Sequence, residues 1–128
     1  MTEIWKSITN YESLYEVSSH GRVRNLSGRI ISQNLVGRPR VYFDVSLYKN
    51  GERKHMRVNR LVAIAFLDEP DSVLKNEVNH FDCDPQNNLL DNLEWVSRRE
   101  NEQHKKFMRI CFAMERDVSE SEIIMKGY

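Results

Sequence analysis

The chain has 128 residues, with 19 basic and 19 acidic side chains, and 40% of its residues are hydrophobic. This length predicts one domain, or one small core with an appended module, and no apolar run approaches the roughly 20 residues of a membrane-spanning helix. The first residues lack a basic segment followed by an apolar one, and two cysteines do not make a disulfide framework. We therefore expect a cytoplasmic protein without a secretion signal and without a membrane partner.

The balanced charge is strongly segregated along the chain. Residues 20–60 carry ten lysines and arginines against two acidic residues, residues 61–96 carry one lysine against eight acidic residues, and residues 97–109 carry five basic residues against two acidic ones. Such segregation favours a polyanionic partner over a merely solvated surface, because the basic residues recur on predicted strands beside aromatic and amide side chains.

Alternating side chains in the first half predict a small twisted antiparallel sheet with a basic face. Arg22 and Arg24 point to the side opposite Val23, since successive side chains of a strand alternate between faces. Asn50-Gly51 is a strong signal for a two-residue hairpin turn. Strands are expected over residues 4–5, 14–17, 22–24, 29–33, 42–48 and 54–58.

The second half predicts a helix, a hairpin and a second helix. Asn59 is a candidate N-cap for a short, buried helix over residues 60–66. Strands are expected over residues 77–80 and 93–96, separated by a polar loop over residues 82–88.

Ser97 and Glu100 form a capping box, in which each side chain bonds to the other residue's backbone amide. The helix that follows is expected to run from Arg98 to about Glu115. The tail over residues 117–128 has little to bury and is expected to add at most a turn of helix.

Residues 78–104 concentrate polar groups that bind metals or move protons. The pattern of strand, polar loop, strand and capped helix, with His80, Asn92 and Asn101 at its turning points, resembles the HNH family of ββα-metal nucleases. Phage and intron-encoded HNH homing endonucleases are the most similar members. The matching residues are Val78-Asn79-His80, Asp82, Asp84, Asn87-Asn88, Asn92-Leu93-Glu94-Trp95-Val96 and Glu100-Asn101.

The N-terminal half resembles the DNA-binding module that commonly precedes this kind of HNH domain. The resemblance lies in residues 3–6, 11–18 and 21–24. Together the two resemblances imply an α+β fold, with a basic β-sheet DNA-binding module over residues 1–58, an HNH nuclease core over residues 59–115 and a tail over residues 116–128.

The resemblance also implies roles for individual residues. His80 takes the place of the family's general base, and a neutral histidine suits that role near neutral pH. Asn79 and Asn101 take the places of the metal ligands for Mg²⁺ or Mn²⁺, which supplies Lewis-acid chemistry. Because adjacent residues on a regular strand face opposite ways, Asn79 and His80 require the strand to break or twist by His80. Asn92 ties the loop down and so aims His80.

Two positions depart from the family pattern, and one further histidine lies nearby. Some members have Asp where this chain has Asn79, and losing that charge weakens a metal site; Asp82, Asp84 or a water are the alternatives as ligand. The usual turn glycine is replaced by Cys83. His104 shares a helix face with Asn101 and either contacts the metal or a phosphate or is a solvated helix histidine.

The basic residues that the sequence offers for DNA contacts lie mostly in the first half, with two at the start of the last helix. These are Arg22, Arg24, Arg38, Arg40, Arg53, Lys54, Arg57, Arg98 and Arg99.

The sequence thus predicts a metal-dependent endonuclease that nicks or cleaves double-stranded DNA, in the host cell of a phage or mobile element. We expect a monomer or weak dimer with no small-molecule cofactor beyond the metal. The alternatives are a catalytically weak or inactive HNH-fold DNA-binding protein and a charged protein-interaction module. Related homing enzymes often continue into a C-terminal DNA-reading module; since this chain ends at Tyr128, a shorter recognition site or lower specificity is expected.

Overall fold

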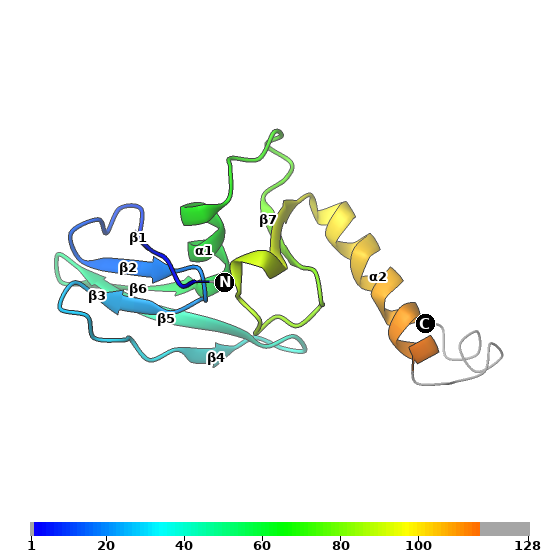
Figure 1. Ribbon diagram of the computed structural model, residues 1–128, viewed down its shortest axis with the longest axis horizontal. Helices are drawn as coiled ribbons and strands as arrows, with labels where there is room; N and C mark the ends of the chain where they lie inside the picture. Colours follow the sequence, from blue (N-terminus) through cyan, green and yellow to red (C-terminus); the bar gives the residue numbers. More distant parts are fainter. Residues whose placement is uncertain (1, 116–128) are drawn as a thin grey trace.

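Helix α1 (Val58–Phe66) lies at the centre of the molecule, between the sheets of the first half and the hairpin of the second (Figure 1). The computed structural model describes residues 2–115. The mixture of antiparallel strands and helices is of the predicted α+β class. The other elements are β1 (Trp5–Ser7), β2 (Tyr15–Ser18), β3 (Val23–Asn25), β4 (Asn34–Val36), β5 (Tyr42–Lys49), β6 (Glu52–Arg57), β7 (Glu77–His80), the 3₁₀ helix η1 (Leu90–Asn92), β8 (Leu93–Val96) and α2 (Arg98–Glu115).

The first half forms two three-stranded antiparallel sheets, in the orders β1-β2-β3 and β4-β5-β6, where the sequence predicted one. The predicted strand over residues 29–33 is wrong, because only Ile30 pairs, in an isolated bridge with Arg24. The Asn25 side chain accepts hydrogen bonds from the backbone amides of Ser27 and Arg29. Backbone bonds from the Asn25 amide to the Arg29 oxygen and from the Ile31 amide to the Val23 oxygen flank this bridge, so the segment pairs with β3 only at this point, and the chain enters the second sheet at β4.

The β5–β6 hairpin confirms the turn predicted at Asn50-Gly51. Lys49 pairs with Glu52 across it, and both turn residues have positive φ, 52° for Asn50 and 78° for Gly51. Two such residues match the right-handed twist of the flanking strands.

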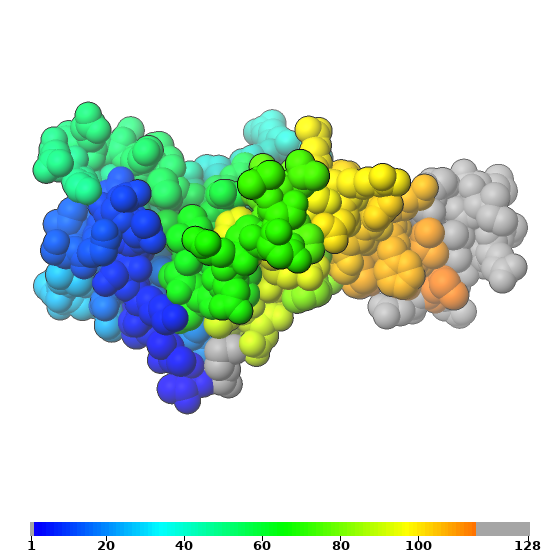
Figure 2. Space-filling model, turned by 90° about the horizontal axis from the view of Figure 1, so that it is seen from above, coloured from blue at the N-terminus to red at the C-terminus, as the bar shows by residue number. Residues whose placement is uncertain are grey.

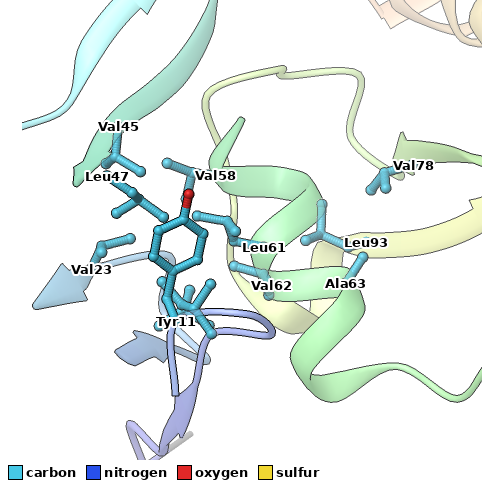
Figure 3. Close-up of a cluster of buried hydrophobic side chains, with 12 residues drawn as sticks. Tyr11, Val23, Val45, Leu47, Val58, Leu61, Val62, Ala63, Val78 and Leu93 are labelled. Atoms are coloured by element: carbon cyan, nitrogen blue, oxygen red, sulfur yellow. The ribbon is translucent and has the colours of Figure 1, made fainter. Parts of the chain in front are cut away.

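The core is continuous from the first half of the chain to the second, across the expected module boundary at residues 58–59. Figure 3 shows Leu61 and Val62 of α1 between the side chains of the β-sheets and those of the β7–β8 hairpin. Buried side chains on the sheet side include Val17, Val23, Val45 and Leu47, and those on the hairpin side are Val78 and Leu93.

The start of α1 differs from the prediction. The helix begins at Val58 with Arg57 as the N-cap residue, and no side chain caps it. Asn59 is therefore not the cap; its Oδ1 instead accepts from the amide of Arg60, and the residue is buried. Because β6 runs directly into α1, burial of Val58 sets the start of the helix and leaves no loop in which a polar cap would sit.

The β7–β8 hairpin and α2 have the predicted bounds, but the strand does not break by His80, because β7 stays in register through that residue. Asn79 pairs with Glu94 and His80 with Leu93. Ser97 and Glu100 exchange both bonds of the capping box, at 3.0 and 3.1 Å. Helix α2 packs on the hairpin near its start and then extends away from the body of the molecule (Figure 2). The predicted tail over residues 117–128 lies outside the described residues.

Within residues 2–115, no helix combines the length and apolarity needed to cross a membrane.

Candidate active site

His80 is the last residue of β7 and is almost completely buried, with 4% of its surface exposed. Its Nε2 lies 3.0 Å from Oδ1 of Asn88, and its ring lies 6.1 Å from the ring of Tyr42. An amide oxygen only accepts hydrogen bonds, so Nε2 donates the proton and Nδ1 keeps its lone pair. The bond to Asn88 thus selects the tautomer in which Nδ1 is the basic nitrogen.

Burial also keeps this imidazole neutral. Removal from water lowers the pKa of His80 below its ordinary 6.5, and the nearby positive charge of Arg40 acts in the same direction. The hydrogen bond that His80 donates to Asn88 and the carboxylates of Asp82 and Asp84 oppose this shift without reversing it. A neutral imidazole is the form that accepts a proton.

The loop after His80 is held by Asn92, at the end of η1. The Asn92 backbone oxygen accepts from the amide of Phe81, and its Oδ1 accepts from the amide of Asp82. Its Nδ2 donates to Oδ1 of Asp82 and to the backbone oxygen of Asn87. These bonds from the backbone and side chain of Asn92 join the start of the loop at Phe81 and Asp82 to its end at Asn87.

Two further contacts hold the turn at Phe81–Cys83. Cys83 adopts a left-handed conformation (φ 61°), so it accommodates the geometry for which a glycine was expected. Nη2 of Arg40 donates to the Cys83 backbone oxygen at 3.0 Å. Nε2 of His104 lies 2.9 Å from the backbone oxygen of Phe81, so the half-buried His104 is directed at the loop.

Asn79 and Asn101 are both buried and are oriented by carboxylates. Nδ2 of Asn79 donates to Glu94, and Nδ2 of Asn101 donates to Glu77, each at 3.0 Å. Glu77 and Asn79 lie two residues apart on β7 and so share a face of the hairpin, and the bond to Glu77 brings Asn101 to that face.

The oxygen atoms of these amides are the candidate metal ligands. Oδ1 of Asn101 is buried and makes no hydrogen bond with any residue in the range 2–115. An orphaned hard oxygen donor is costly to bury unless something else satisfies it, and Mg²⁺ prefers such donors. In the same range no cluster of three or more histidines, cysteines or acidic residues is arranged to hold a metal. The orphaned oxygen of Asn101 and the Glu77 carboxylate bonded to the same amide are the features that fit a hard cation at this position.

A basic pocket of about 270 Å³ opens beside Asn101. The guanidinium of Arg57 lies 4.1 Å from the ring of Tyr42, and that of Arg60 lies 5.5 Å from the ring of Trp95. Arg60 and Lys105 are functional candidates that the sequence reasoning did not select. Lys105 could have been found, because it follows Asn101 by one helical turn. The lining residues are Tyr42, Arg57, Asn59, Arg60, Glu77, Val78, Asn101 and Lys105.

The other predicted DNA-binding residues are spread over the surface. Arg40 lies at the active-site loop, as described above. Arg98 and Arg99 line a depression that also includes Glu77. Arg53 and Lys54 lie near the tip of the β5–β6 hairpin, and Arg38 is exposed in the loop between β4 and β5.

Arg22 and Arg24 are engaged within the protein. Their guanidinium groups lie 5.5 and 4.0 Å from the Trp5 ring. Arg22 pairs with Glu3, and Arg24 pairs with Glu16. The structure therefore does not bring these two arginines to the site around His80.

Comparison with known proteins agrees with this geometry. Residues 3–48 match the NUMOD4 motif, and residues 74–103 match an HNH endonuclease family. The DNA endonuclease I-HmuI of Bacillus phage SP01 is 37% identical over 99 residues, which cover 76% of this chain and 54% of that protein. A solved structure that describes DNA binding and cleavage by I-HmuI superposes with a TM-score of 0.70 at 33% identity, over 96% of this chain and 66% of that one. The chain belongs to the HNH homing endonuclease family.

Two relatives from Acanthamoeba polyphaga mimivirus share this similarity. The uncharacterized HNH endonucleases L247 and L245 are 39% and 36% identical over 107 and 105 residues, or 80% and 81% of this chain. The chain spans 26%, 30% and 54% of the lengths of L247, L245 and I-HmuI. The superposition with I-HmuI also confirms the α+β fold of this HNH protein.

Proposed function

We propose that this HNH protein hydrolyses phosphodiester bonds in double-stranded DNA, by nicking or cleaving the duplex, with His80 as the general base. The observation that carries the proposal is the bond from His80 Nε2 to Asn88, which leaves Nδ1 with a free lone pair inside a braced loop. The described residues of this loop match the family's HNH region, and I-HmuI is named as a DNA endonuclease.

A divalent ion, Mg²⁺ or Mn²⁺, completes the site when bound to the oxygens of Asn79 and Asn101, and it supplies Lewis-acid stabilisation of the phosphate and the leaving oxygen. Support comes from the orphaned oxygen of Asn101 and from the carboxylates that hold each amide. Glu77 and Glu94 bring negative charge next to the two amides, which offsets the charge missing at Asn79. Partners of this kind, bonded to a ligand rather than to the ion, commonly tune metal affinity.

The remaining residues position the loop and the DNA. Asn92 and His104 hold the turn that follows His80. Arg57, Arg60 and Lys105 line the pocket beside Asn101, where they attract phosphates next to the reacting one. Further candidates for phosphate contacts elsewhere on the surface are Arg38, Arg40, Arg53, Lys54, Arg98 and Arg99. In this proposal residues 1–58 hold the duplex and residues 59–115 carry the chemistry.

The test is cleavage of supercoiled plasmid with Mg²⁺ or Mn²⁺, with and without a chelator. The proposal predicts relaxed or linear product that needs the metal and is lost in His80→Ala, while His80→Ala still binds DNA in a gel shift. Full activity of His80→Ala would remove His80 from the mechanism.

The amide at position 79 favours a second candidate function, that of a catalytically weak DNA-binding protein. Its signature is a salt-sensitive gel shift without cleavage in Mg²⁺, Mn²⁺ or Ni²⁺. A third class, a charged protein-interaction module, predicts no gel shift at all.

A further inference from the structure

The NUMOD4 region (residues 3–48) contacts residues 88–90, which include the hydrogen-bond partner of His80. The backbone oxygen of Ser19 accepts from the amide of Leu90 at 2.8 Å. Gly21 lies against Asn88, which is itself 6% exposed and bonds to His80. These contacts link a turn of the first sheet to the candidate base.

The fit at Gly21 leaves no room for a side chain. A Cβ at this position would lie 2.9 Å from Cβ of Asn88 and 3.0 Å from its backbone oxygen. Gly21 also has a φ of 82°, which side-chain-bearing residues rarely adopt. The backbones of residues 21 and 88 can therefore approach this closely only because residue 21 is a glycine.

The turn that carries Gly21 is itself fixed. Oγ of Ser18 accepts from the amides of His20 and Arg22, and the Gly21 backbone oxygen accepts from Nε2 of Gln33 at 2.8 Å. Asn88 is therefore backed by a rigid surface. Gly21 meets Asn88 at its Cβ and backbone, so this surface fixes the point from which the Asn88 side chain extends to His80.

We propose that Asn88 is a positioning residue that fixes the tautomer of His80, and that the Gly21 turn of the NUMOD4 region holds Asn88 in place for this task. The inference rests on the proposed function of His80 as a base, but the positioning itself is a structural claim about one hydrogen bond and one backbone contact. The NUMOD4 region then contributes to the catalytic geometry as well as to DNA contact. Asn88 touches no reacting atom and acts only through His80.

The first test measures the ring nitrogens of His80 by ¹⁵N NMR, which distinguishes the two neutral tautomers without any cleavage assay. Wild-type protein is expected to show the proton on Nε2. Asn88→Ala should give mixed tautomers and a cleavage rate lower by at most the roughly 10²–10⁴-fold that a positioned general base contributes. Asn88→Asp keeps an oxygen acceptor and should retain the Nε2–H tautomer, and it covers the case that Asn88→Ala fails to fold. Gln86→Ala, an exposed change in the same loop, is the control and should match wild type.

The second test uses two glycines with the same backbone strain. Gly28 has a φ of 90°, and a Cβ at that position would meet no atom within 4 Å, whereas a Cβ at Gly21 would meet Asn88. Both Gly21→Ala and Gly28→Ala incur the strain of a positive φ, but only Gly21→Ala should shift the ¹⁵N signals of His80 and slow cleavage. Equal effects of the two changes would overturn the coupling, and an unchanged tautomer in Asn88→Ala would overturn the role of Asn88.

These experiments can refute the positioning role of Asn88 and the proposed nuclease activity independently of each other. If wild-type protein does not cleave DNA but the tautomer of His80 still responds to Asn88→Ala and Gly21→Ala, the positioning role stands and the nuclease proposal falls. If wild-type protein cleaves DNA and the tautomer does not respond, the nuclease proposal stands and the positioning role falls.

Discussion

At the scale of single residues, the candidate site depends on which atoms of its amide side chains are already hydrogen-bonded within the protein. Asn79 and Asn101 each direct an N–H toward a carboxylate, and this fixes where their oxygens point. Asn88 shows the reverse arrangement, since its oxygen is committed to His80. Glu94 and Glu77 therefore matter as anchors even though neither is a proposed ligand.

Removing the anchor of Asn79 should weaken metal binding. Glu94→Ala frees the Asn79 amide to rotate and removes a nearby negative charge, so metal affinity should fall by about 10–100-fold. Glu94→Gln keeps the acceptor and removes only the charge, so its affinity should lie between those of wild type and Glu94→Ala. Titration calorimetry with Mn²⁺ measures this order, and equal affinities for wild type and Glu94→Ala would contradict it.

A second residue-scale prediction concerns acid stability. The hydrogen bond from Arg22 lowers the pKa of Glu3 from 4.5 to about 2. A carboxyl with a depressed folded pKa adds stability above its unfolded value and loses it as the pH falls toward the folded value. The unfolding free energy lost in Glu3→Gln should therefore be largest above pH 4.5 and shrink toward pH 2.

Chemical unfolding at several pH values checks this dependence. Glu69→Gln, between α1 and β7, removes the same charge away from Arg22 and is the control. A difference between wild type and Glu3→Gln that stays constant from about pH 6 to about pH 2 would contradict the pairing.

At the scale of elements, the sequence predicted well the structural features that depend only on neighbouring residues. The turn at Asn50-Gly51 and the capping box at Ser97 and Glu100 each involve neighbouring residues, so their chemistry can be recognised without the fold. The strand expected over residues 29–33 failed because the segment pairs with β3 only around the bridge between Arg24 and Ile30. The cap expected at Asn59 failed because a buried strand-to-helix junction replaced a loop.

The residues of the candidate site likewise divide into those that the sequence could predict and those that only the fold brings together. His80, Asn92 and Asn101 were given roles through a family resemblance, whereas Asn88 and Glu94, which match the same family, were given none. Asn88 becomes a partner of His80 only through the packing of the loop. Glu94 becomes the partner of Asn79 only through the register of β7 and β8, which sequence spacing does not specify.

The capping box should determine how firmly α2 presents Asn101. Ser97→Ala removes the bond to the Glu100 amide and should lower the unfolding free energy by about 1 kcal/mol. Denaturant unfolding measures the change, with the exposed substitution Ser13→Ala as its control. A midpoint equal to that of Ser13→Ala would show that packing alone holds the start of α2.

At the scale of the whole molecule, α1 joins both halves into one core (Figure 3). Leu61 is 3% exposed and lies at the centre of this core. Leu61→Ala should therefore cost about 2–5 kcal/mol of unfolding free energy and destabilise the NUMOD4 and HNH regions together. Fluorescence and NMR signals from the two regions should report their unfolding in one transition. Two separated transitions would contradict a shared core.

The shared core explains why a basic sheet surface, a braced loop and two buried amides keep fixed positions relative to one another. The most direct test of the proposed site is a crystal structure with Mn²⁺ and duplex DNA, in which anomalous scattering locates the ion. We predict one ion bound by the oxygens of Asn79 and Asn101, with Nδ1 of His80 facing the reacting phosphate. An ion bound elsewhere, or one bound by only one of these amides while cleavage proceeds, would contradict this site.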